Sequence, residues 1–105
     1  MNALNALAQQ HILESEARLL HIDELTARSR RGSTKAIDVL LEQAQVHRIQ
    51  ADRDRLALEL EGLRVMPRTD TPEVVGRAKG LTSALANVGL ELEKALAAVL
   101  ETGHR

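Results

Sequence analysis

Apolar residues recur at every third or fourth position between Val74 and Val99, and no other part of the chain is as regular. The stripe consists of Val74, Ala78, Leu81, Leu85, Val88, Leu92, Ala95 and Val99. This spacing places the residues on one side of an α-helix and defines a heptad seam. Asp70 or Thr71 can cap such a helix, and Pro72 suits its first position. The pattern therefore predicts a helix over about residues 72–102.

The segment from about residue 3 to residue 30 contains neither Pro nor Gly, which predicts a long helix. It carries two apolar seams on nearly opposite sides. The first seam consists of Ala8, Ile12, Ser15, Leu19 and Ile22, flanked by Leu4, His11 and Leu25. The second, here called the outer seam, consists of Ala3, Ala6, Leu13, Ala17, Leu20 and Ala27. We expect the first seam to face the rest of the chain and the outer seam to need another partner.

A second helix is predicted over about residues 34–64. Gly32 suits a left-handed helix end, and Ser33 or Thr34 suits the next N-cap. The apolar positions form an early stripe of Ile37, Leu40, Leu41, Ala44, His47 and Ala51 and a later stripe of Val46, Ile49, Leu56, Leu60 and Leu63. Because the two stripes are out of phase, either the helix bends or it changes partner halfway. Pro67 ends the helix.

These elements predict one all-α domain spanning residues 1–105. Three helices of similar length joined by short turns are typical of an antiparallel three-helix bundle, or of helical coiled-coil hairpins, with up-down-up topology. The 105-residue chain has no Phe, Tyr or Trp, and its apolar content of 44% is mostly Ala, Leu, Val and Ile. A small core without rings is thin, and oligomerisation is a common remedy.

Charge and composition exclude several classes of protein. A formal net charge of −1 argues against a domain-wide nucleic-acid footprint. Without Cys there is no disulfide, thiol nucleophile or Cys-based metal site. No signal-peptide pattern and no apolar run long enough to span a membrane are visible, so we expect a cytoplasmic protein. The excess of Arg over Lys and the abundance of Ala and Leu hint at a bacterial, GC-rich genome.

Candidate interface residues lie on the sides of the helices away from the predicted core. Leu13, Ala17 and Leu20 belong to the outer seam, and Leu90 and Leu100 lie on a comparable outer line of the last helix. We interpret them as a surface for self-association or for a partner protein. The alternative is that single exposed leucines among alanines need no explanation. We expect a homo-oligomer, in the simplest case a dimer.

Gly76, Gly80 and Ala84 form a line of small residues beside the core stripe of the last helix. Glycine inside a helix costs about 1 kcal/mol relative to Ala. We therefore expect these positions to admit a closely packed neighbour, with a binding groove as the second interpretation.

Basic residues gather near the first turn: Arg28, Arg30, Arg31 and Lys35. Together with free N–H groups at the start of the next helix they could hold a phosphate or an acidic partner. The simpler interpretation is that cations at a helix C-terminus complement the helix dipole. No aromatic residue is present for base stacking.

No arrangement typical of an enzyme is found. His11 and Glu14, and likewise His21 and Glu24, are spaced three apart as in helical metal sites, but the main seams of the other helices supply no further ligands. His11 and His47 are instead expected to be polar residues at the core or its boundary. We predict no catalytic site, no metal and no cofactor.

The sequence thus favours a non-enzymatic protein–protein interaction module that acts through helix–helix packing. It would be an adaptor, an assembly subunit or a small chaperone, and it would self-associate. The alternative is a regulator that binds anions or nucleic acid through the basic end around Arg30 and Arg31.

Overall fold

The computed structural model describes residues 3–32 and 34–102, with side chains as far as residue 99. This part of the chain contains four helices and no strand. They are α1 (Ala3–Arg31), α2 (Lys35–Leu41), α3 (Ala44–Arg64) and α4 (Pro72–Thr102). The predicted all-α class is confirmed.

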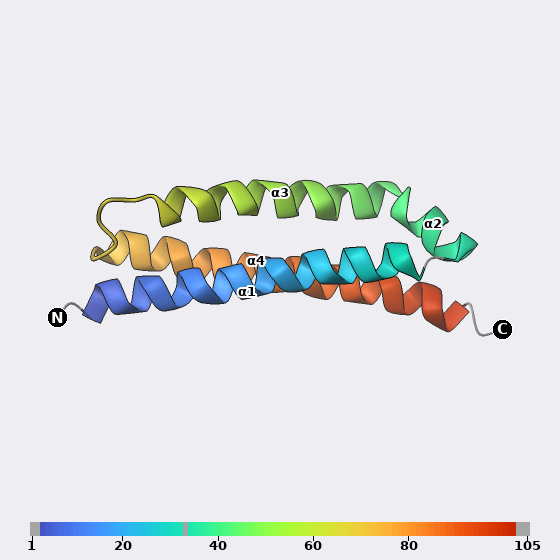
Figure 1. Ribbon diagram of the computed structural model, residues 1–105, viewed down its shortest axis with the longest axis horizontal. Helices are drawn as coiled ribbons and strands as arrows, with labels where there is room; N and C mark the ends of the chain where they lie inside the picture. Colours follow the sequence, from blue (N-terminus) through green and yellow to red (C-terminus); the bar gives the residue numbers. More distant parts are fainter. Residues whose placement is uncertain (1–2, 33, 103–105) are drawn as a thin grey trace.

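The long helices α1, α3 and α4 lie lengthwise beside one another, and the short α2 lies at one end of the molecule (Figure 1). The chain reverses its direction between α1 and α3 and again between α3 and α4. The molecule is a rod of 57 × 19 × 19 Å. Each helix contacts the three others, and the contact between α1 and α4 is the most extensive.

The core forms where the apolar stripes of the helices meet. The predicted stripe of α4 is buried from Val74 to Ala95, and Val99 is partly buried. The first seam of α1 faces the core through Ala8, Ile12 and Ile22. The later stripe of the second predicted helix, from Val46 to Leu63, is buried as part of α3. Aliphatic side chains make up most of this thin core, and Ser15 and Thr82 are buried among them.

The single helix predicted over residues 34–64 is wrong, because the chain breaks at Glu42 and Gln43. Leu40 and the later stripe lie about half a turn apart at about 100° per residue. One continuous helix would bury one set and expose the other. The break re-aims the chain, so that Ile37 and Leu40 of α2 are buried together with the stripe of α3.

Because of the same break, the prediction is wrong for three positions of the early stripe. Ala44, His47 and Ala51 are exposed instead of facing the core. They follow the break and lie on α3, whose buried side is set by Val46 and Ile49. His47 is therefore a surface residue, with 59% of its side chain exposed.

Two helix starts agree with the predicted caps, whereas one helix end does not. Ile37 N donates to Thr34 Oγ1 at 3.3 Å, and Val74 N donates to Thr71 Oγ1 at 3.3 Å. Gly32 is not left-handed, since no described glycine has a positive φ. Its N–H donates to Arg28 O at 3.1 Å, which extends the hydrogen bonding of α1.

Candidate functional site

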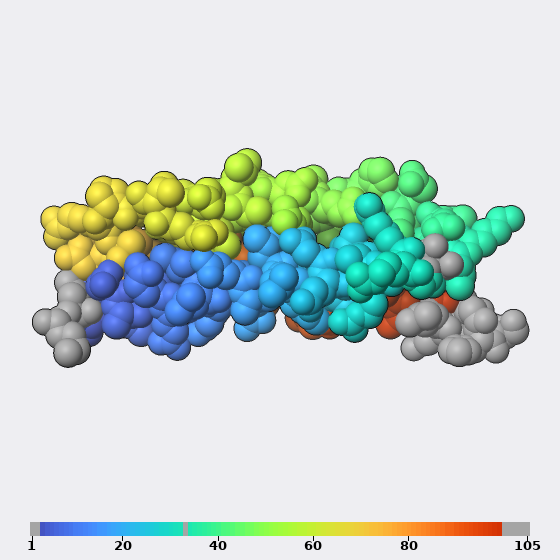
Figure 2. All heavy atoms as spheres, in the orientation of Figure 1, coloured from blue at the N-terminus to red at the C-terminus, as the bar shows by residue number. Residues whose placement is uncertain are grey.

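The outer seam of α1 lies on the molecular surface along its whole length. Leu13 is 63% exposed and Leu20 is 59% exposed, and Ala17 between them is also exposed. In Figure 2, α1 forms a continuous band on one face of the rod, with α3 beside it. On α4, Leu90 is 51% exposed. The side chain of Leu100 lies outside the described residues.

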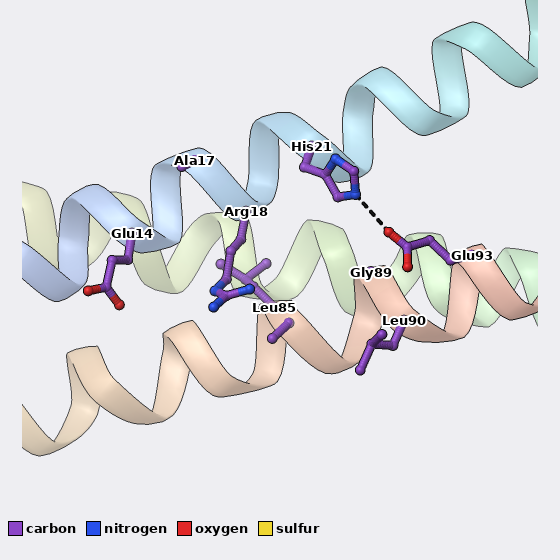
Figure 3. Close-up of a pocket in the computed structure, with 9 residues that line it drawn as sticks. Glu14, Ala17, Arg18, His21, Leu85, Gly89, Leu90 and Glu93 are labelled. Carbon is purple, nitrogen blue, oxygen red and sulfur yellow. Dashed lines mark hydrogen bonds and ion pairs between the residues drawn. The ribbon is translucent and has the colours of Figure 1, made fainter.

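A hollow of about 490 Å³ lies between α1 and α4, next to the outer seam. Ala17, Arg18 and His21 line it from α1, and Leu85 and Leu90 line it from α4. Figure 3 shows Arg18 extending from α1 toward α4, with α3 passing behind. The groove thus opens on the side of the α1–α4 pair that α3 does not cover. It brings the predicted residues Ala17 and Leu90 to one place.

A second hollow of about 380 Å³ continues this groove toward α2. It shares Glu93 with the first hollow and adds Leu25, Leu96, Ala97 and, from α2, Ile37. One groove with a mostly apolar floor therefore follows the α1–α4 contact past Glu93. Sequence reasoning did not place the residues of this second part in one groove, because α2 becomes a wall only through the break after Leu41.

Ion pairs flank the outer seam on both sides. On the α3 side, Arg53 holds Asp23 through two hydrogen bonds, Nε to Oδ1 at 2.9 Å and Nη2 to Oδ2 at 2.8 Å. The hydrogen bond with Asp23 raises the pKa of Arg53 above its ordinary value. On the α4 side, His21 Nε2 lies 2.8 Å from Glu93 Oε1. The apolar seam is therefore bordered by polar side chains that are already paired.

A buried polar pair joins α1 to α4 beneath this surface. Ser15 is fully buried, and its Oγ lies 2.7 Å from Thr82 Oγ1. The Thr82 hydroxyl also reaches His11 O at 3.0 Å and Ala78 O at 3.1 Å. Ser15 was predicted to lie on the seam, but Thr82 was missed. The burial of Thr82 could have been predicted from its position directly after Leu81 of the core stripe.

His11 lies at the edge of this pair, as expected for a polar boundary residue. Its Nδ1 is buried and makes no hydrogen bond to any described residue. Glu14 Oε2 lies 3.7 Å from it, beyond hydrogen-bonding distance. Because His11 itself is partly exposed, the arrangement is that of a boundary side chain and not of an enclosed site.

The basic residues near the first turn lie at the surface at the end of α1 and the start of α2. Arg28 lines the second hollow between α1 and α4. Arg30 lines a different hollow, together with Asp38 and Glu42. Arg31 and Lys35 are exposed. Arg28 and Arg30 therefore line different hollows, and Arg30 has acidic neighbours in its hollow.

Gly76 and Gly80 of α4 have no close neighbour among the described residues. A Cβ placed on Gly76 or on Gly80 meets nothing within 4 Å. The predicted close packing at this line is therefore wrong for this chain. A Cβ on Gly89 would lie 3.7 Å from Ile22 Cγ1, an ordinary contact.

The described residues offer neither a cluster of metal ligands nor a membrane-spanning helix. No group of three or more His, Cys, Asp and Glu side chains there could hold a metal ion. None of the described helices combines the length and the apolar character that crossing a bilayer requires. His21 pairs with Glu93 of α4 and not with Glu24, the neighbour that the spacing suggested.

Comparisons with known proteins add no assignment: no family model, no curated protein and no solved structure matches this chain. The α1–α4 groove and the adjoining outer seam are therefore the surface features that bear on function.

Proposed function

We propose that this protein is a non-enzymatic interaction module that binds a protein helix on the outer seam of α1 and the adjoining α1–α4 groove. The proposal takes the long helices as an antiparallel up-down-up bundle in which α3 covers one side of the α1–α4 pair. The opposite side is then the place for a further helix. An amphipathic helix in an apolar groove is a common mode of protein recognition.

The observation that carries the proposal is the exposure of Leu13 and Leu20 on the outer seam and of Leu90 in the adjoining groove. Each of these side chains is more than half exposed. Single exposed leucines are ordinary. Here, however, Leu13 and Leu20 lie on the outer seam on either side of Ala17, and Ala17 lines the same hollow as Leu90. An apolar patch rimmed by paired charges is typical of a protein–protein contact.

The test replaces Leu13 and Leu20 by glutamate in one variant, L13E/L20E. The matched control is Leu58→Glu, because Leu58 lies on α3 and is 75% exposed. We expect L13E/L20E to have a lower molecular mass than the wild-type assembly in light scattering, while its circular dichroism remains helical. Leu58→Glu should retain that mass.

The same three proteins are then used as bait with and without nuclease. A protein that wild type and Leu58→Glu retain after nuclease treatment, and that L13E/L20E loses, supports the proposal. Equal behaviour of all three proteins in both assays contradicts it. A complex that nuclease or moderate salt destroys would instead favour binding through the basic residues Arg28, Arg30, Arg31 and Lys35.

A further inference from the structure

We infer that the helix bound on the outer seam is α1 of a second copy of this chain, running antiparallel about a two-fold axis at Ala17. This inference rests on the proposed function and names its occupant. In this arrangement Leu13 of each copy packs beside Leu20 of the other. The two Ala17 residues face each other, where their small side chains let the helix backbones approach.

The spacing of the outer seam supports a symmetric partner. Ala6, Leu13, Leu20 and Ala27 recur every seven residues, and Ala17 fills the intermediate heptad position. A heptad repeat of this kind is typical of helix pairs. The order Ala, Leu, Leu, Ala reads the same in both directions. An antiparallel copy of α1 therefore presents the same small and large side chains at matching heights.

The charges beside the seam favour the antiparallel orientation over the parallel one. A parallel two-fold pair would place identical residues opposite each other, so Glu24 would face Glu24 and Arg31 would face Arg31. The antiparallel pair brings Glu24 next to Gln10 and Glu14 next to His21. Like charges opposite each other are unfavourable. Glu16, near the axis, is already paired with Arg64 Nε of its own chain at 3.2 Å.

The exposed area is sufficient for a second copy. The chain exposes 6949 Å², whereas a compact monomer of its mass, 11.5 kDa, exposes about 5800 Å². The excess is about 1100 Å² for this rod, and a standard stable interface buries about 800 Å² per partner. Covering the α1–α4 face with a second rod would bring the exposed area per chain close to that of a compact protein.

Engineered cysteines test the register, because the chain has no Cys of its own. We make Ala17→Cys, Gln10→Cys and Glu24→Cys singly, and Leu58→Cys on α3 as the control. Ala17→Cys should form a covalent dimer on mild oxidation. Gln10→Cys and Glu24→Cys should each remain uncrosslinked alone, since two copies of residue 10 lie about 21 Å apart along the axis, too far for a disulfide. Their mixture should give the mixed dimer.

The outcomes separate this inference from the proposed function. Self-crosslinking of Gln10→Cys and of Glu24→Cys would show a parallel pair and overturn the inference. Absence of crosslinks in Ala17→Cys, together with a monomer mass for the wild type in light scattering, would also overturn it. The proposed function would still stand if another protein were then lost from L13E/L20E and retained by Leu58→Glu.

Discussion

Thr82 and Ser15 set the relative position of α1 and α4 more specifically than the apolar residues around them. Aliphatic side chains can slide past one another at small cost, because dispersion contacts are non-directional. The hydrogen bond between the two hydroxyls has one geometry, with the atoms 2.7 Å apart. Since Thr82 also donates to a backbone carbonyl, the Ser15 hydroxyl is the donor in this pair. The groove above it therefore has a defined register.

This coupling predicts a non-additive pair of mutations. Ser15→Ala should lower the free energy of unfolding by about 1 kcal/mol, because Thr82 keeps a carbonyl acceptor. Thr82→Val should lower it by about 2 kcal/mol, because it leaves the fully buried Ser15 hydroxyl without its partner. The double variant should lose about 1 kcal/mol less free energy of unfolding than the sum of the losses in the two single variants. Urea denaturation measures all three. Thr26→Val is the control, since Thr26 Oγ1 bonds only within α1, to Ile22 O. Additive costs would show that the pair does not act as a unit.

Among the helices, α2 depends most on its neighbours. Seven residues are too few for a helix that is stable alone. Its side chains Ile37 and Leu40, which are 6% and 4% exposed, hold it against the bundle. Because α2 also forms part of the wall of the second hollow, its attachment decides how far the groove extends.

Removing one of these anchors should therefore release α2 selectively. Leu40→Ala is expected to weaken the packing of α2 against the bundle by at least about 2 kcal/mol, the lower end of the range for a buried leucine. Amide hydrogen exchange should become faster over residues 35–41 while the centre of α4 stays protected. Val39→Ala, at a position that is 56% exposed, should leave exchange unchanged. An equal loss of protection in α4 would mean that α2 and the long helices unfold as one unit.

The spacing of apolar residues predicted the helices whose apolar stripe stays on one side along the whole helix. The stripe from Val74 to Val99, the two seams of α1 and the caps at Thr34 and Thr71 follow from local chemistry. The phase change between the two stripes left a bend open, but the position of the break at Glu42 was not predicted, because no Pro or Gly marks it. It is a tertiary effect, in which burial of Leu40 together with the α3 stripe outweighs the lost helical turn. The second half of the groove, which depends on this break, was missed for the same reason.

The molecule as a whole is a rod whose surface is large for its core. Its buried side chains are mostly aliphatic and include no aromatic ring, so folding of one chain alone removes a limited apolar area from water. Association along the rod adds burial without lengthening the chain. The stability of the protein is then expected to depend on its concentration, because an assembly that forms from folded chains shifts the unfolding equilibrium by mass action.

Thermal unfolding tests this dependence directly. For a dimer that unfolds to two single chains, a hundredfold rise in concentration adds about 2.7 kcal/mol of stability, which corresponds to an increase in Tm of roughly 5–10 °C. The L13E/L20E variant should unfold at a Tm that does not change with concentration. Leu58→Glu should retain the wild-type dependence, because Leu58 lies on α3, away from the outer seam. If the wild-type Tm is the same across this range, the folded chain is complete by itself, and the exposed leucines of α1 contribute to binding a different protein or to none.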